Sequence, residues 1–241
     1  MSSLRPAEIL ALIPARDEEE TVRGVVQELF QQGVGWVRVV DNGSTDATAM
    51  KAEEAGAEVL QESEPGYGRA CWRGLQTLPD SCRWILFCDA DGSDDLKQLP
   101  LFFEAIEDGG LDFVLGDRRC RSREEANLGR LQNFGNGLAT GLIRLGWGQH
   151  YSDLGPLRLI RRSALEQIGM KDRTWGWTLE MQVRAVEEGM TIRELPVNYL
   201  PRQGGESKIS GNLIGGMRAG WVILRTLGAL YLTRHQRKAT S

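Results

Sequence analysis

The sequence is poor in the residues that build zinc sites, disulfide frameworks and histidine-based catalytic centres. Histidine occurs only twice, as His150 and His235, away from every polar motif described below. The four cysteines form no CxxC pair and have no histidine within ligand spacing, so neither a zinc site nor a disulfide framework is predicted. They are Cys71, Cys82, Cys88 and Cys120. We therefore expect a reducing, cytoplasmic setting.

Leader segments and long apolar runs are also lacking. The first six residues contain no apolar stretch behind a basic segment, so no secretory signal peptide is predicted. The uncharged stretch 131–143 is shorter than the roughly 20 apolar residues that span a bilayer, and the apolar stretch 212–232 carries Arg218 and Arg225. Both stretches predict helices that either lie on a membrane surface or pack on the domain or on a second subunit.

Charge is unevenly distributed along the chain, whose formal net charge is -4. Residues 196–241 hold seven Lys or Arg and the single acid Glu206, which leaves a balance of -10 for the rest. An acidic body with a basic end indicates that the end meets an anion, either a phosphate or an anionic bilayer surface. A solvated basic tail explains Arg234, Arg237 and Lys238 equally well.

Strand and helix signals alternate along the chain. The predicted strands are 9–13, 36–40, 58–61, 84–88 and 112–116. The predicted helices are 19–32, 45–55, 69–78, 96–107, 128–145 and 212–232. This alternation predicts one α/β domain with a mostly parallel sheet flanked by helices. Ligands of such sheets bind beyond the carboxyl ends of the strands.

Two carboxylates one residue apart follow the predicted strand 84–88. Asp89 and Asp91 can present hard oxygen ligands to a divalent cation, which in turn neutralises a diphosphate leaving group. Acidic clusters also occur as plain helix caps, and for Ser93, Asp94 and Asp95, before Leu96, we expect the cap.

Two further polar clusters follow neighbouring predicted strands. In VDNGSTD at 40–46, Asp41 can accept hydrogen bonds from a base N–H, Gly43 permits a tight turn and Ser44 can cap the next helix. A turn with a cap also explains this segment without any ligand. In IPARDEE at 13–19, a rigid turn and acidic residues follow the adjacent strand. Three such clusters at one sheet edge favour a pocket over three coincidental turns.

The order of these motifs resembles one protein family. IPARDE, VDNGSTD and DADG, in that order, are similar to family 2 glycosyltransferases with the GT-A fold, and within them to polyprenyl- or dolichyl-phosphate mannosyl- and glucosyltransferases. The resemblance covers nearly the whole chain. It implies a GT-A catalytic domain, Rossmann-like, over 1–211, followed by a C-terminal amphipathic helix and basic tail at 212–241.

The resemblance also implies roles for residues at the three strand ends. The donor-nucleotide residues that it implies are Pro14, Ala15, Arg16, Glu18, Asp41, Asp89 and Ala90. Asp41 would read the base, while Asp89 and Asp91 would hold Mg²⁺ or Mn²⁺ against the diphosphate, with Asp91 counted as catalytic. Asn42 departs from the family, which usually has a second acid at this position, and this leaves the base or ribose preference open.

The glycine-containing segment Gly66 to Cys71 corresponds, in the resemblance, to a turn and helix start near the donor. Arg69 or backbone N–H groups, that of Gly68 included, are expected to meet a phosphate there. An ordinary loop before a helix is the alternative. The segment begins like a dinucleotide fingerprint, but Cys71 stands where the third glycine belongs, which disfavours a NAD-dependent oxidoreductase.

Acceptor-side roles are implied for four more residues. Arg118 and Arg130 would face the acceptor phosphate, because guanidinium groups suit its charge and geometry, although exposed arginines usually have no such role. Asp153 and Glu180 would lie beside the donor sugar and the acceptor and are counted as catalytic.

The implied reaction is an inverting, in-line transfer of a hexose from GDP-mannose or UDP-glucose to a polyprenyl phosphate. Arg202 and Lys208, in a glycine-rich loop, would close over the phosphates and stabilise the departing nucleoside diphosphate. A surface loop is the alternative for this segment. A phosphate acceptor is already ionised and needs no strong base, whereas a hydroxyl acceptor would require Glu180 or Asp153 as the base.

The implied partners are a nucleotide-sugar donor, a lipid-phosphate acceptor and, peripherally, the cytoplasmic membrane face. A homodimer is plausible because apolar helices lie outside the sheet, and no nucleic-acid partner is predicted. Two other functions stay open. One is the same donor chemistry onto a soluble hydroxyl acceptor, and the other is a non-catalytic nucleotide-sugar-binding protein.

Overall fold

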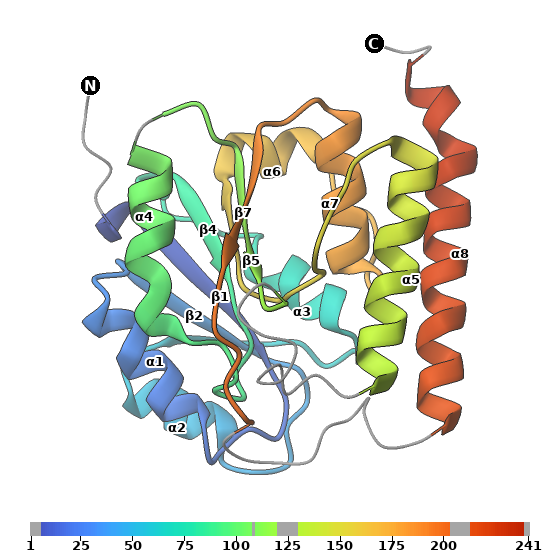
Figure 1. Cartoon of the computed structure of the whole chain (residues 1–241). Helices are drawn as coiled ribbons and strands as arrows, with labels where there is room; N and C mark the ends of the chain where they lie inside the picture. Colours follow the sequence, from blue (N-terminus) through green and yellow to red (C-terminus); the bar gives the residue numbers. More distant parts are fainter. Residues whose placement is uncertain (1–5, 108, 120–129, 203–212, 239–241) are drawn as a thin grey trace.

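A central sheet carries the fold (Figure 1). The computed structural model describes residues 6–107, 109–119, 130–202 and 213–238, and only the backbone at 130–132, 213–219 and 235–238. Within these residues the sheet has seven strands in the order β3-β2-β1-β4-β6-β5-β7. They are β1 (Ile9–Ala15), β2 (Trp36–Asp41), β3 (Glu58–Gln61), β4 (Trp84–Phe87), β5 (Phe113–Asp117), β6 (Arg158–Arg161) and β7 (Ile192–Pro196).

The predicted mostly parallel sheet is confirmed, with one antiparallel strand that the sequence pattern did not predict. Strands β3, β2, β1 and β4 run parallel, whereas β6 is antiparallel to both of its neighbours, β4 and β5. Strand β7, also unpredicted, is parallel to β5. Both strands are short and rich in polar residues, so neither shows the apolar run that marks β1 and β4.

Helices cover both faces of the sheet. Along β1, Ile9, Ala11 and Ile13 face one hydrophobic core, while Leu10 and Leu12 face the other, which explains the continuous apolar run. The first core lies under α1 (Val22–Gln31), α2 (Thr48–Glu54) and α4 (Leu99–Glu107). The second lies under α3 (Tyr67–Gly74), α6 (Arg162–Ile168) and α7 (Trp177–Glu187). Two short 3₁₀ turns, η1 (Pro6–Glu8) and η2 (Leu96–Gln98), precede β1 and α4.

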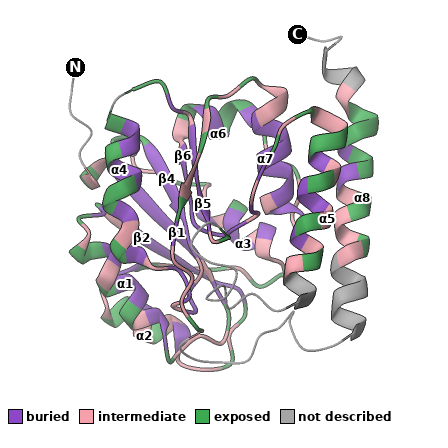
Figure 2. Ribbon diagram, viewed as in Figure 1, coloured by how far each residue is buried: buried purple, intermediate pink, exposed green. Residues whose placement is uncertain are grey.

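Two longer helices, α5 (Arg130–Trp147) and α8 (Leu213–Lys238), form an outer pair beside α7 (Figures 1 and 2). Leu227 and Leu230 of α8 are buried in the second core, and the rings of Trp147 and Tyr231 meet edge to face at 5.9 Å. None of the helices in the described ranges is long and apolar enough to cross a bilayer. The division of the chain at residue 211 stays a prediction.

Candidate active site

The three predicted polar clusters meet at the carboxyl ends of β1, β2 and β4. The N–H of Asp17, after β1, donates to Ser44 Oγ, after β2, at 2.9 Å. The hydroxyl of Thr21 donates at 2.7 Å to the carbonyl oxygen of Ala90, which follows β4. Side-chain contacts thus join the segment after β1 to the ends of β2 and β4. That the three clusters form one ligand site stays a prediction.

The first cluster lies along the end of β1. Pro14 and Ala15 are its last two residues, and Ala15 is buried. Arg16 is exposed and its Nε lies 3.7 Å from Asp17 Oδ2. Asp17 has a φ of 51°, in the left-handed region, and its Oδ1 accepts the N–H of Thr45 at 2.7 Å. The predicted nucleotide residues of this cluster therefore stand on a turn tied to the neighbouring strand end.

Asp41, the last residue of β2, is 5 % exposed. Its Oδ1 accepts the N–H of Ser44 at 3.0 Å and also the Ser44 hydroxyl. Because Ser44 is used in this way, it does not cap the next helix, and α2 begins only at Thr48. The prediction of a cap at Ser44 is wrong, and the base-reading role of Asp41 stays a prediction.

Asn42 holds the segment that leads to α3. Its Nδ2 donates to the carbonyl oxygens of Glu62 at 3.0 Å and Glu64 at 2.8 Å, and its Oδ1 accepts the N–H of Gly66 at 2.8 Å. A carboxylate cannot donate to the two carbonyls. The structure therefore gives a reason for the amide at the position where the resembled family usually has an acid.

The carboxylates after β4 crowd together. Asp91 Oδ1 accepts the N–H and the hydroxyl of Ser93 at 3.0 and 2.6 Å, and Asp94 Oδ2 accepts the N–H of Asp89 at 3.0 Å. Asp94 thus binds back to Asp89 and does not cap the next helix. Asp95, the residue before η2, makes no side-chain cap bond either. The cap prediction is wrong for both.

Burial and mutual repulsion perturb these acids. Burial, followed by the charges of Asp94 and Asp91, raises the pKa of Asp89 well above its usual value. Burial also raises the pKa of Asp94 to about 6. Burial therefore disfavours the ionised forms of these carboxylates, and a bound cation would favour them.

The donor set at Asp89 and Asp91 fits Mg²⁺ or Mn²⁺, because both ions prefer carboxylate oxygens. Within the described ranges no three His, Cys, Asp or Glu side chains form a ready-made metal cage. A Mg²⁺ site at Asp89 and Asp91 would need the phosphates of a substrate and water to complete it.

Arg202 links two of the strand ends. Its Nη1 lies 3.3 Å from Asp91 Oδ2, and its Nη2 pairs with Glu18 Oε1. The predicted phosphate-binding arginine is therefore at the site, where it contacts carboxylates of the first and third clusters. Lys208, its predicted companion, lies outside the described residues.

The turn that begins α3 is closely packed. The N–H of Gly68 donates to the carbonyl oxygen of Thr174 at 2.9 Å, and a Cβ at Gly68 would come within 2.8 Å of that oxygen. This N–H is not available to a phosphate, so the expectation that Gly68 contributes it is wrong. The proposed phosphate contact of this turn then falls to the side chain of Arg69.

Arg118 and Asp153, which we expect on the acceptor side, form a buried bidentate pair. Arg118 Nε and Nη2 lie 2.6 and 2.9 Å from the two oxygens of Asp153, and the guanidinium lies over the ring of Tyr199 at 4.9 Å. Burial alone would raise the pKa of Asp153, but Arg118 outweighs burial, so this pKa lies below its usual value. An acceptor phosphate at Arg118 would share the guanidinium with Asp153.

The other two residues expected on the acceptor side are Arg130 and Glu180. Arg130 begins α5, and its side chain lies outside the description. Glu180, in the first turn of α7, accepts the N–H groups of Lys171 and Asp172. In the described part of the chain no hydrogen bond or ion pair joins Glu180 to Asp91 or Asp153.

Sequence reasoning missed Asn136, which supports the buried pair. Its Nδ2 donates to Asp153 Oδ1 at 2.9 Å, and its Oδ1 accepts the N–H of Leu154 at 2.9 Å. The sequence offers no signal that singles it out, because α5 contains two other amides, Gln132 and Asn133.

Comparison with known sequences agrees with this arrangement. A model of the family described as Glycosyl transferase family 2 matches residues 11–169, more than half of the chain. The chain belongs to glycosyltransferase family 2. It is a glycosyltransferase.

Similar family 2 proteins match most of the chain. An uncharacterized glycosyltransferase of Mycobacterium tuberculosis is 36% identical over 88% of this chain and 94% of its own length. A dolichyl-phosphate hexose transferase of Haloferax volcanii is 30% identical, over 87% and 89% of the two chains. An undecaprenyl-phosphate mannosyltransferase of Micrococcus luteus is 27% identical, over 90% and 97%.

Solved structures support the GT-A fold. Glucosyl-3-phosphoglycerate synthase of Mycobacterium tuberculosis, crystallised with Mn²⁺, UDP-glucose and phosphoglyceric acid, superimposes with a TM-score of 0.72 over 91% of this chain and 79% of that one. The sequence identity is 20%, so this likeness concerns the fold alone.

Proposed function

We propose that this family 2 glycosyltransferase moves a hexose from GDP-mannose or UDP-glucose to a polyprenyl phosphate, with Mg²⁺ or Mn²⁺ and with inversion at the anomeric carbon. The observation that carries the proposal is the meeting of Glu18, Asp91 and Arg202 at the ends of β1 and β4. The guanidinium of Arg202 pairs with these carboxylates in the structure. When the donor binds, this guanidinium is positioned to bind the diphosphate instead of the carboxylates.

The chain's own residues would orient the two substrates. Pro14 to Glu18 and Asp41 line the nucleotide, and Asp89 and Asp91 hold the metal ion, which supplies positive charge to the leaving diphosphate when it is bound. An oxygen of the acceptor phosphate forms the new bond to the anomeric carbon while the bond to the diphosphate breaks. Arg202 stabilises the charge that develops on the leaving group.

The acceptor proposal draws on relatives and on charge. Two relatives carry the names dolichyl-phosphate hexose transferase and undecaprenyl-phosphate mannosyltransferase. Helices α5 and α8 hold seven of the 29 basic residues and none of the 33 acidic ones, which leaves -11 for the rest of the chain. A basic, apolar outer layer on an acidic protein suits contact with an anionic bilayer surface.

One face of α8 suits this contact in detail. Trp221, Leu224 and Leu232 are 67 %, 49 % and 77 % exposed and, with Arg225 and Gly228, recur at helical spacing along one side of the helix. Trp221 and Arg225 lie at the edge of this side and also line the pocket beside α7. We call these five residues the outer stripe of α8. Peripheral attachment to the cytoplasmic face of a membrane through this stripe is part of the proposal.

The proposal is tested by transfer of label from UDP-glucose and from GDP-mannose into polyprenyl phosphate, with Mn²⁺ and with a chelator. We expect metal-dependent label in the lipid phase from one donor. Donor binding without lipid labelling, together with turnover on a soluble hydroxyl acceptor, would replace the lipid acceptor. Donor binding without release of nucleoside diphosphate to any acceptor would indicate a binding protein.

A further inference from the structure

The carboxylate of Glu180 binds a loop segment of the protein. Its Oε2 accepts the N–H of Lys171 at 3.0 Å and the N–H of Asp172 at 2.6 Å, while Oε1 lies 3.3 Å from Arg184 Nε. The residue is 3 % exposed. Removing this carboxylate would leave two backbone donors and a guanidinium without the acceptor that now satisfies them.

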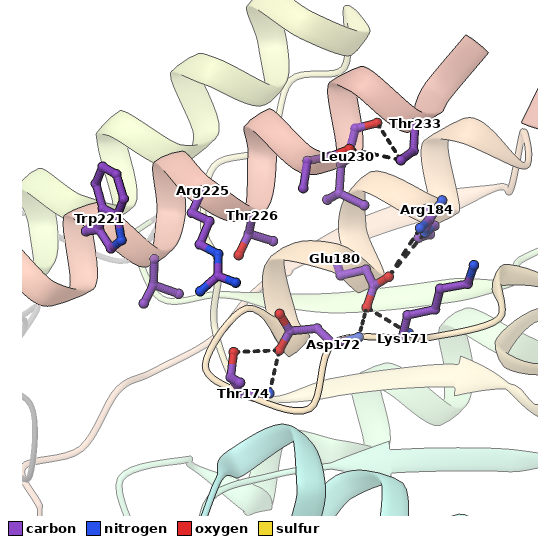
Figure 3. Close-up of a pocket in the computed structure, with 12 residues that line it drawn as sticks. Lys171, Asp172, Thr174, Glu180, Arg184, Trp221, Arg225, Thr226, Leu230 and Thr233 are labelled. Carbon is purple, nitrogen blue, oxygen red and sulfur yellow. Dashed lines mark hydrogen bonds and ion pairs between the residues drawn. The ribbon is translucent and has the colours of Figure 1, made fainter. Parts of the chain in front are cut away.

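On the side of α8, the loop segment 171–174 borders a pocket (Figure 3). The pocket has a volume of about 370 Å³, and Trp221, Arg225 and Thr226 are among the α8 residues that line it. Figure 3 shows Glu180 below α8, with its hydrogen bonds reaching Lys171 and Asp172. Part of this side is open pocket, so the hydrogen bonds to Glu180 are among the contacts that hold the segment in place.

On its other side, the segment supports the start of α3. The carbonyl oxygen of Thr174 accepts the N–H of Gly68 at 2.9 Å, and a Cβ on Gly68 would lie 2.8 Å from backbone atoms of Arg173 and Thr174. The guanidinium of Arg173 also lies 4.2 Å from the centre of the Trp72 ring. A displacement of 171–174 would therefore remove the support on which α3 begins.

The turn Gly66–Gly68 has a second support on β2. The N–H of Gly66 donates to Asn42 Oδ1 at 2.8 Å, and Asn42 directly follows Asp41. The turn, and with it Arg69, is thus held between the nucleotide side of the sheet and the segment that Glu180 binds.

We propose that Glu180 is a positioning residue of the donor site, which acts through residues 171–174 on the turn Gly66–Gly68 and on Arg69. The proposal rests on the proposed function in one respect, namely that this turn faces the donor phosphates. Glu180 then works as a hydrogen-bond acceptor and takes no proton from the acceptor. A general base must reach the proton that it removes, whereas both oxygens of Glu180 already face N–H donors.

Three variants separate these roles in the full-length chain. E180A removes the acceptor, whereas E180Q keeps an oxygen that can accept the two N–H groups. E187Q is the matched control, because Glu187 is on the same helix and pairs with the same Arg184, at 3.2 Å. The other contact of Glu187 is Trp147 Nε1, at 2.9 Å, and not the 171–174 segment.

The readouts are the Kd of UDP and GDP with Mn²⁺, amide hydrogen exchange in residues 62–75, and kcat and KM. For E180A we expect about a ten-fold rise in nucleotide Kd and donor KM, since one or two lost hydrogen bonds correspond to about 1–3 kcal/mol. Exchange in 62–75 should become faster and kcat should change less than KM. E180Q and E187Q should stay within about three-fold of the unmodified chain for each quantity, on the same grounds.

Two results would overturn the proposal. One is a fall of about 10²-fold or more in kcat for E180Q with unchanged nucleotide Kd, as a general base would show. The other is unchanged exchange in 62–75 for E180A. If E180A does not fold, G68A disrupts the same contact from the α3 side and should give the same rise in Kd. If the unmodified chain binds neither nucleotide, the proposed function is wrong, and the exchange comparison still decides whether Glu180 holds the turn.

Discussion

The proposed donor side and the proposed acceptor side of the site are stabilised by different kinds of interaction. Where β1, β2 and β4 end, side chains such as Asp41 and Asp91 bind backbone N–H groups two or three residues away. On the acceptor side, Arg118 pairs with Asp153, 35 residues away, and both side chains are largely or fully buried. Turn hydrogen bonds, together with contacts between strand ends such as that of Asp17 with Ser44, thus shape the proposed donor side, whereas a buried ion pair shapes the proposed acceptor side.

The largest loss of stability is expected when the side chain of Arg118 is removed. R118A leaves Asp153, whose side chain is 0 % exposed, as a buried and unpaired charge, and we expect a loss of about 3–5 kcal/mol in the free energy of unfolding. Urea denaturation measures this loss. R23A, which breaks the exposed pair with Glu54, is the control and should cost at most about 1 kcal/mol.

The ion pair of Arg118 and Asp153 also makes the free energy of unfolding depend on pH. Because the pKa of Asp153 is lowered in the folded state, the stability that it contributes is present above its unfolded pKa of about 3.9 and is lost as the pH falls through the folded value. R118A should show less of this acid dependence. An unchanged slope of stability against pH would contradict the pair's role.

Substitutions of the carboxylates on the proposed donor side should lower activity more than they lower stability. D89N and D91N should each lower kcat/KM by about 10²–10³-fold, as expected when a charge-stabilising group is removed, and should weaken Mn²⁺-dependent nucleotide binding. The folded-state pKa of Asp89 is raised, so its ionised form destabilises the fold above its unfolded pKa, and D89N should unfold at the same temperature or higher. Calorimetry beside kinetics checks both, and a clearly lower Tm for D89N would contradict this account.

A smaller effect is expected at Asn42. N42D replaces the Nδ2 group, which donates to two carbonyl oxygens, by an oxygen that can only accept. The segment 62–66 should therefore become less firmly held. The nucleotide Kd should rise about ten-fold, since the loss of such hydrogen bonds corresponds to about 1–3 kcal/mol. Isothermal titration with UDP and GDP measures this change. Equal affinity of N42D and the unmodified chain would show that the amide is not needed.

The smallest effect is expected at the outer stripe of α8. R225A should weaken binding to vesicles that contain anionic lipid by about five-fold, in line with about 1 kcal/mol per basic residue near a membrane surface. R23A, whose arginine lies on α1, is the control. Vesicle binding that is unaffected by R225A, combined with a concentration-dependent dimer, would indicate that the stripe contacts a second copy of the chain.

The strength of the local signal decided what the sequence could predict. The strands β1 to β5 and the convergence of their polar ends follow from apolar runs and from turn residues beside them. Strand β6 was missed because half of its residues are arginines, one of which, Arg158, is fully buried. Its Nη1 donates to the carbonyl oxygen of Thr178 at 3.1 Å. The spacing of apolar residues in the sequence does not predict this contact.

In the site, too, residues in local motifs could be predicted, whereas contacts that depend on the folded backbone could not. Asp41, Asp89 and Asp91 could be named from motif order, but the use of Ser44 by Asp41 and of Asp94 by Asp89 depends on turn geometry that competes with helix capping. The loop held by Glu180 could not be foreseen, because its partners lie on a segment without a motif.

The amide of Asn42 has a consequence for how this family varies. The side chain of Asn42 bonds to backbone groups of Glu62, Glu64 and Gly66 together. The residue type after Asp41 and the length of the segment before α3 are therefore constrained jointly. Family members with an acid at this position should therefore differ in the segment before α3, and the two positions should covary. A residue that looks like an exception in a motif would then mark a distinct lineage of donor sites.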